Sequence, residues 1–201
     1  TDDFEKIPGS PIAYWVTDEF RDSFDKHGSL SSDITFRQGM STTDPANFER
    51  HWQEVSSAKL NLSRIDAFLE KDTSAYWNPF NKGGDFRKWY GNQLTIVRYE
   101  RNGEDLLDLV RGKYPNISDP EFVIKNRSFF FSDFISYSSF TSSAFSAKYV
   151  PSGFAFSVAG SAIFTDKWDK KVVLGFLCST SMSAFAAAIN PTFGFQISDI
   201  A

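Results

Sequence analysis

One stretch of the sequence concentrates residue types that contact nucleic acids. Residues 77–91 read W-N-P-F-N-K-G-G-D-F-R-K-W-Y-G and hold two tryptophans, one tyrosine, two phenylalanines and three cations. The Gly-Gly pair at 83–84 allows positive φ and a close approach of a ligand to the backbone. Lys82, Arg87 and Lys88 place positive charge beside flat aromatic faces. These residue types suit the binding of a polyanion that carries bases. The alternative interpretation is an aromatic turn that packs over a core, with the cations exposed only to solvent.

Two other segments carry side chains able to contact bases. Residues 31–38 predict a short strand that ends in a loop at Arg37 and Gln38, whose side chains can bond guanine or adenine edges in two places, although plain solvent exposure is the alternative. Residues 128–143 read S-F-F-F-S-D-F-I-S-Y-S-S-F-T-S-S. Hydroxyl groups contact phosphates and base edges, and the interleaved phenylalanines favour a folded strand and turn over a low-complexity linker.

The predicted DNA contacts combine the aromatic run, these two segments and three isolated polar residues. The full set is Arg37, Gln38, Lys82, Gly83, Gly84, Arg87, Lys88, Trp89, Tyr90, Arg127, Ser136, Tyr137, Ser138, Ser139, Thr141, Lys148 and Asn190.

The distribution of charge permits DNA binding despite a net charge of -4. Residues 1–33 hold eight acidic residues and three cations, so this segment carries -5 and the remaining chain +1. Binding phosphate needs a local patch and not a basic protein. The patch around residues 82–101 is modest, which predicts weak affinity for DNA by this chain alone.

Length and composition limit the possible classes of fold. A chain of 201 residues buries one sizeable core, and we expect it to be a piece of a longer protein. The single cysteine, Cys178, excludes an internal disulfide framework and fits a reducing, cytoplasmic compartment. Serine and threonine interrupt the apolar run 172–189, which suits a buried helix better than a membrane span.

Periodicity predicts an α+β fold, with a mixed or antiparallel twisted sheet and flanking helices. The expected helices cover residues 12–26, 47–52, 60–69, 104–110 and one or two within 171–189. Asp44-Pro45 and Ser63 are the expected starts of the second and third. The expected strands lie within residues 31–38, 94–99, 145–149, 153–158 and 195–197, with a turn at 102–103 and a hairpin around 151–153.

The run 77–91 resembles the W-x-P-Y-N-K-G-G-x-F-R-K-W-Y-G signature of adenine-specific DNA methyltransferases of the BREX phage-defence type (PglX) and of related type II restriction-modification methylases. Four other segments match in the same order, at residues 7–16, 37–44, 132–164 and 174–200. Phe80 stands where the pattern has tyrosine, and Thr43 where it has glycine.

The resemblance implies a DNA target recognition domain, with a fold similar to the recognition domains of type I and type II restriction-modification enzymes. Residues 1–30 would be a linker helix from a missing N-terminal catalytic domain and residues 31–201 the recognition domain. The implied partners are double-stranded DNA, that catalytic domain in cis and other phage-defence proteins, with no membrane role. The alternative is a protein-docking module of the defence complex.

Catalytic motifs are absent from the sequence, so the enzyme activity and S-adenosylmethionine are expected only in the parent protein. The [DN]-P-P-[YF] motif that holds a flipped adenine is missing, and the segment Asn78-Pro79-Phe80 is interpreted as a turn without a catalytic role. His27 and His51 have no partner motif for a metal or for general-base chemistry. We therefore expect no catalytic residue, no metal and no cofactor in this chain.

Overall fold

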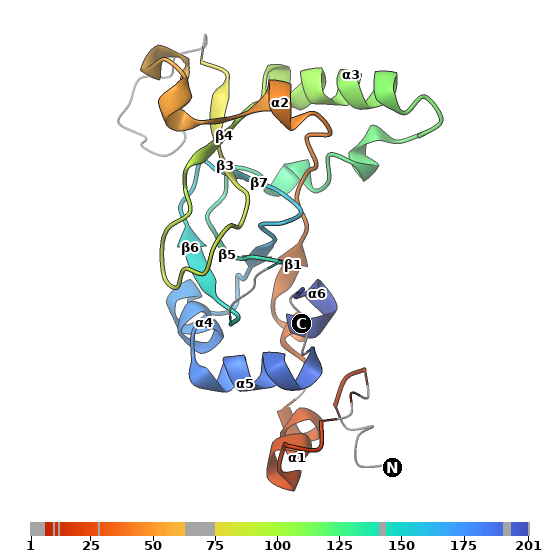
Figure 1. Cartoon of the computed structure of the whole chain (residues 1–201), viewed down its shortest axis with the longest axis vertical. Coiled ribbons are helices and arrows are strands. Elements are labelled where there is room, and N and C mark those ends of the chain that lie inside the picture. The colour runs from red at the N-terminus through yellow and green to blue at the C-terminus, as the bar shows by residue number, and fades with distance from the viewer. Residues whose placement is uncertain are drawn as a thin grey trace.

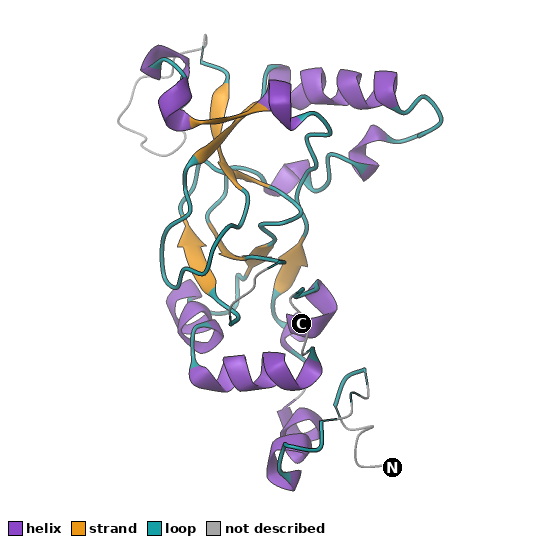
Figure 2. Ribbon diagram, in the orientation of Figure 1, coloured by secondary structure: helices purple, strands orange, loops and turns teal. Residues whose placement is uncertain are grey.

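The computed structural model describes residues 7–9, 11, 13–27, 29–62, 75–140, 144–190 and 194–200. The fold is α+β, as predicted, but its strands form two four-stranded sheets (Figures 1 and 2). The strands are β1 Thr35–Arg37, β2 Glu49–His51, β3 Trp77–Asn81, β4 Thr95–Arg98, β5 Phe134–Tyr137, β6 Ala147–Val150, β7 Ala155–Phe156 and β8 Ala162–Phe164. The α-helices are α1 Asp18–His27, α2 Pro45–Phe48, α3 Glu104–Lys113, α4 Lys170–Leu177, α5 Thr180–Ile189 and α6 Ile197–Ile200.

The lower sheet in Figure 1 has the strand order β1-β8-β5-β6, and all of its pairs are antiparallel. Every residue of β5 is buried. Adjacent side chains of a strand point to opposite faces, so Phe134 enters one apolar cluster and Ile135 the other. The sheet is therefore covered on both faces, which explains why β5 lacks the polar alternation of a half-exposed strand.

The upper sheet has the order β2-β4-β3-β7 and is mixed. β3 is antiparallel to β4, with Asn78 opposite Val97, and parallel to β7, with Phe80 opposite Ala155. All five residues of β3 are buried, and the strand lies between β4 and β7 in the interior of the upper sheet.

Two apolar clusters stabilise the fold. The first joins the upper sheet, α3 and one face of the lower sheet, and includes Phe80, Leu106, Phe130, Phe134 and Phe156. The second joins the other face of the lower sheet to α4, α5 and α6, and includes Ile135, Tyr137, Phe145, Leu174 and Ile200. Most of the phenylalanines among the described residues belong to these clusters or pack against them.

Helix α1 packs on α5 through aromatic contacts. The ring centroids of Phe20 and Phe24 lie 4.7 and 5.2 Å from that of Phe185. The division into a linker at residues 1–30 and a domain at 31–201 stays a prediction, but the described part of the first segment contacts α5 of the second.

Several predicted elements are confirmed. β1 precedes the loop at Gln38, β4 and α3 lie where periodicity places them, and the apolar segment 171–189 forms α4 and α5. The predicted turn has Asn102 at φ 58° and Gly103 at φ 88°. Thr43 adopts φ 57°, the left-handed region that glycine enters most easily, in keeping with the glycine of the resembled pattern.

Of three further predicted helices, two differ from the structure. The first begins at Asp18, well after residue 12. In the second, Asp44 caps the helix and Pro45 starts it as expected, but the helix ends at Phe48 because β4 pairs with the residues that follow. The third, at 60–69, falls mostly outside the described residues.

The predicted hairpin at 145–158 is wrong. β6 pairs with β5 in the lower sheet, whereas β7 pairs with β3 in the upper sheet. The turn itself is present, with Gly153 at φ 98°, but it leads from one sheet to the other. The strand predicted at 195–197 is also wrong: the Asp199 carboxylate accepts a hydrogen bond from the Gln196 backbone N–H at 2.8 Å, which caps a short helix instead.

Substitution of Gly39 tests the contact between the loop after β1 and β7. A Cβ atom at Gly39 would lie 1.9 Å from the backbone oxygen of Phe156. We expect Gly39→Ala to lower the free energy of unfolding by about 3 kcal/mol, because the two backbones must separate. Chemical denaturation measures the change.

The matched control is Gly112→Ala in α3, where a Cβ atom meets nothing within 4 Å. This variant should gain about 0.5 kcal/mol from helix propensity. Equal stability of the Gly39→Ala and wild-type proteins would contradict the close approach.

Candidate nucleic-acid interface

The aromatic run continues from β3 into a long loop, residues 82–94, which returns to the upper sheet at β4. Figure 1 shows this loop extending beside β6 toward α4. The loop therefore begins in one sheet and reaches the edge of the other.

Asn81, the last residue of β3, connects the two sheets at the start of the loop. Its buried Nδ2 donates to the Ser136 Oγ at 2.7 Å and to the Gly160 backbone oxygen at 2.9 Å. Its own backbone oxygen accepts from the Ser157 N–H at 3.0 Å. The loop thus leaves the sheet from a fixed point.

The Gly-Gly pair lets the backbone turn and also carries two anchors. Gly83 and Gly84 have φ of 78° and 100°. The Gly83 oxygen accepts from the Lys148 Nζ at 2.8 Å, and the Gly84 oxygen accepts from the Ser138 Oγ at 2.7 Å. A Cβ atom at Gly83 would lie 2.7 Å from the Ala159 oxygen, so this position needs glycine for space as well as for conformation.

The tip of the loop is bonded to the lower sheet and to α4. The Trp89 N–H donates to the Ala147 oxygen at 3.0 Å, and the Trp89 oxygen accepts from the Tyr149 N–H at 2.9 Å. The Lys88 Nζ donates to the Cys178 oxygen at 2.6 Å. Cys178 ends α4, where the helix dipole favours a cation.

Large side chains project outward from this anchored loop. The exposed fractions are 41% for Phe86, 55% for Trp89, 62% for Tyr90 and 50% for Leu94. Arg87 is exposed, and within the described parts of the chain it has no ion pair or hydrogen bond. The loop therefore presents aromatic faces and one free cation on a fixed backbone.

The other predicted cations already have partners. Lys82 forms an ion pair with Glu49 at 2.5 Å, and Arg127 forms one with Glu121 at 2.5 Å, which raises the pKa of the Arg127 guanidinium. The Arg37 guanidinium lies 5.0 Å from the centre of the Phe129 ring. The Gln38 backbone oxygen accepts from the Asn126 Nδ2 at 2.8 Å, so the loop after β1 is also held in place.

The hydroxyl-rich segment is interior over residues 134–139. Ser136, Tyr137, Ser138 and Ser139 are buried, and the three serines bond to groups of the protein itself. Asn190 donates to the Gly194 oxygen and to Asp199. Thr141 lies outside the described residues. These side chains support the fold, and we leave them out of the surface proposed below.

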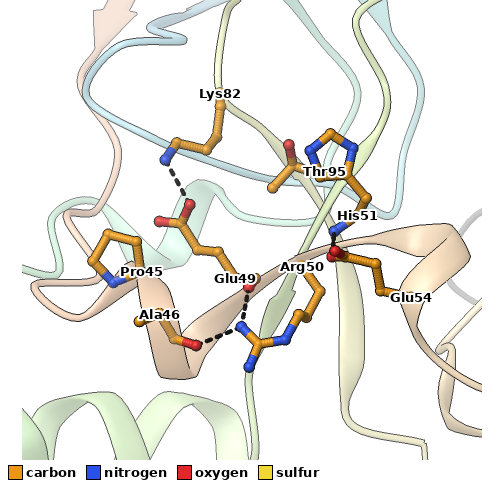
Figure 3. A pocket seen from close by; sticks show the side chains of 8 residues that line it. All are labelled: Pro45, Ala46, Glu49, Arg50, His51, Glu54, Lys82 and Thr95. Carbon is orange, nitrogen blue, oxygen red and sulfur yellow. Dashed lines mark hydrogen bonds and ion pairs between the residues drawn. The ribbon is translucent and has the colours of Figure 1, made fainter.

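A hollow of about 500 Å³ lies beside β2, under the start of the loop (Figure 3). Its charged groups are satisfied within the protein: Glu49 accepts from Lys82 and from the Thr42 Oγ1, and the Arg50 Nη1 donates to the backbone oxygens of Ala46 and Glu49. Sequence reasoning missed Glu49, because 33 residues separate it from Lys82 and no local pattern links them.

The segment Asn78-Pro79-Phe80 lies inside β3 and is not the turn that the sequence suggested. Its side chains are buried, and the Asn78 Nδ2 donates to the Tyr76 oxygen at 3.0 Å. These residues do not fit a pocket for a flipped base or for S-adenosylmethionine, so no chemistry is assigned to them.

Within the described ranges, no cluster of three or more histidine, cysteine or acidic residues is arranged to hold a metal. No single described helix is long and apolar enough to cross a membrane; α4 and α5 pass that test only together, as a pair bent by 61°.

Lys148 provides a pH-dependent test of the anchor under the loop. The amine is 2% exposed, and burial lowers its pKa from 10.5 to about 8. Below pH 8 both the folded and the unfolded chains bind the proton. Between pH 8 and 10.5 only the unfolded chain does, so the free energy of unfolding should rise with pH, by up to about 3 kcal/mol.

Lys148→Met lacks this titration. Denaturant unfolding of both proteins from about pH 7 to pH 10 should show the wild type gaining stability relative to the variant. Parallel pH profiles would contradict the burial of the amine. Groups such as Tyr149 titrate in both proteins, so their effects cancel in the comparison.

Comparison with known proteins identifies relatives over nearly the whole chain. The chain is 36% identical over 199 residues to the adenine-specific methyltransferase PglX of Lacticaseibacillus casei (strain Zhang), which covers 98% of this chain and 16% of that protein. It is 35% identical over 202 residues to the adenine-specific methyltransferase BrxX of Escherichia coli O9:H4 (strain HS), which covers 98% of this chain and 15% of that protein. No protein-family model matches the chain.

These matches confirm the resemblance that the motifs predicted. The chain spans about a sixth of the length of these relatives. It is homologous, along 98% of its sequence, to one segment of the adenine-specific methyltransferases PglX and BrxX.

Proposed function

We propose that this chain is the DNA target recognition part of an adenine-specific methyltransferase. The observation that carries the proposal is the loop 82–94: its backbone is bonded to both sheets, while Arg87, Trp89 and Tyr90 face outward. A rigid backbone with exposed aromatic and cationic groups is suited to a nucleic acid, because it binds without losing much conformational freedom. Homology to a segment of adenine-specific methyltransferases makes DNA the polyanion to consider first.

The rest of the parent protein supplies the catalysis in this proposal. Residues 31–201 hold the duplex, and residues 1–30 lead from the N-terminal catalytic domain. That domain binds S-adenosylmethionine and extrudes the adenine into its pocket, since the target nitrogen is inaccessible inside a duplex. By the resemblance, the cell gains a methyl mark on its own DNA during phage defence.

The interface combines one loop from each sheet. Arg87 contacts a phosphate, while Arg37, the last residue of β1, and Gln38, which follows it, read base edges. The Arg37 side chain is restrained beside the Phe129 ring, because its Nη1 donates to the Phe36 oxygen at 3.0 Å. Its remaining N–H groups are the donors for a base edge. With Lys82 and Arg127 engaged in ion pairs, the affinity of this surface for phosphate is modest.

A second candidate function is protein docking, which α4 favours. Val172 and Phe176 are spaced by one turn of α4, and Trp168 lies just before the helix. Their exposed fractions are 63%, 40% and 49%. Such a stripe suits another protein surface of the parent enzyme or of a defence partner. Salt distinguishes the two functions, because phosphate contacts weaken steeply as salt rises and apolar contacts do not.

Arg87→Glu in the parent methyltransferase tests the DNA proposal. We expect DNA affinity to fall roughly tenfold, since one hydrogen bond to a charged group contributes about 1.5 kcal/mol. The slope of the logarithm of affinity against the logarithm of salt concentration should become shallower by about 1, because one phosphate contact is lost. Fluorescence anisotropy with a labelled duplex at several salt concentrations measures both.

Lys59→Glu is the matched control, because this exposed cation lies against Tyr76 near the first residue of β3, at the end of the strand away from the loop. It should bind DNA as the wild type does. If Arg87→Glu left affinity and salt dependence unchanged while assembly with partner proteins failed, the docking function would replace the DNA proposal.

A further inference from the structure

Trp89 has a backbone conformation that tryptophan rarely adopts. Its φ is 74°, in the left-handed region where a bulky side chain meets its own backbone. Such a conformation costs on the order of 1–2 kcal/mol, and persists only where surrounding contacts enforce it. Asparagine or glycine would fit this position more easily, yet the sequence has tryptophan. Strain of this kind is often found at binding sites.

The contacts that enforce the strain also fix the direction in which the Trp89 side chain leaves the backbone. The backbone N–H and oxygen of Trp89 are both hydrogen-bonded to β6. Trp89 and Lys148 therefore form a parallel β-bridge. On one side Lys88 is bonded to the end of α4, and on the other Tyr90 is 62% exposed. The indole itself is 55% exposed. The fold holds a large, flat side chain outward on a backbone that is bonded in place.

The surroundings of Trp89 favour a flat, uncharged contact. Arg87 is the exposed cation of the loop without a partner among the described residues, whereas Phe86, Trp89 and Tyr90 are all exposed. An indole gains most from stacking on another aromatic face, and nucleobases provide one. In an intact duplex each base face is covered by its neighbours. A base face becomes available where the duplex is opened.

We propose that Trp89 stacks on the base left unpaired when the target adenine leaves the duplex. This inference rests on the proposed function, because extrusion of adenine is the step that uncovers the opposite base. Insertion of an apolar side chain beside an unstacked base offsets part of the cost of opening the helix. Trp89 would then stabilise the opened DNA without contacting the extruded adenine.

The experiment is a binding cycle with the full-length parent methyltransferase. One duplex contains the sequence that the parent enzyme methylates, as mapped in the genome. The second duplex is identical but has an abasic residue opposite the target adenine. On the first duplex, Trp89→Ala should weaken binding roughly 5- to 150-fold, the range for loss of one stacked base. On the second duplex, wild type and Trp89→Ala should bind equally. Trp89→Phe should restore most of the difference, because it retains an aromatic face.

Two controls separate this inference from the proposed function. Phe122→Ala removes an aromatic side chain that is 69% exposed on another segment, and should bind both duplexes as the wild type does. If Arg87→Glu weakens binding but Trp89→Ala does not, the stacking proposal is wrong and the DNA surface stands. If neither variant weakens binding, both fail. An equal loss by Trp89→Ala on both duplexes also overturns the proposal, since the contact would not involve the opposite base. Thermal unfolding of each variant checks that the fold is intact.

Discussion

The rest of the structure depends on the hydrogen bonds that attach residues 81–89 to both sheets. Asn81 bonds to Ser136 in the lower sheet, and the oxygen of Gly83 accepts from Lys148 in its neighbouring strand. Further along, Trp89 pairs through its backbone with β6. The loop that carries the exposed aromatic groups is therefore one of the connections between the two sheets, and its shape is set by contacts that also hold the sheets together.

Local signals in the sequence predicted local structure well. The Asn102-Gly103 turn before α3, the Asp44 cap and the apolar run of α4 and α5 depend on nearby residues, and the structure contains them all. Strand pairing depends on distant residues, so a plausible hairpin proved to be two strands of different sheets. Burial is also a property of the whole fold. The serines at 136, 138 and 139 have the chemistry to contact DNA but are enclosed when β5 is covered on both faces.

The same limit applies to the charges of the candidate interface. The sequence grouped Lys82, Arg87 and Lys88 as one basic patch, but Lys82 pairs with Glu49 and Lys88 bonds to the end of α4. Only long-range contacts reveal these partners. What remains exposed is one cation among aromatic groups, so a contribution from base stacking becomes as important to the proposed function as contact with phosphate. Because the backbone of the loop is anchored, its aromatic side chains can stack on bases without losing much conformational freedom.

The central claim is that this chain selects the DNA sequence that the parent enzyme methylates. The most direct measurement exchanges this segment in the parent for the homologous segment of the Escherichia coli relative and maps the methylated adenines in the genome. Our account predicts that the methylated sequence changes to that of the donor of the segment. Continued methylation at the sequence of the recipient enzyme would contradict it, and would place sequence selection outside this chain.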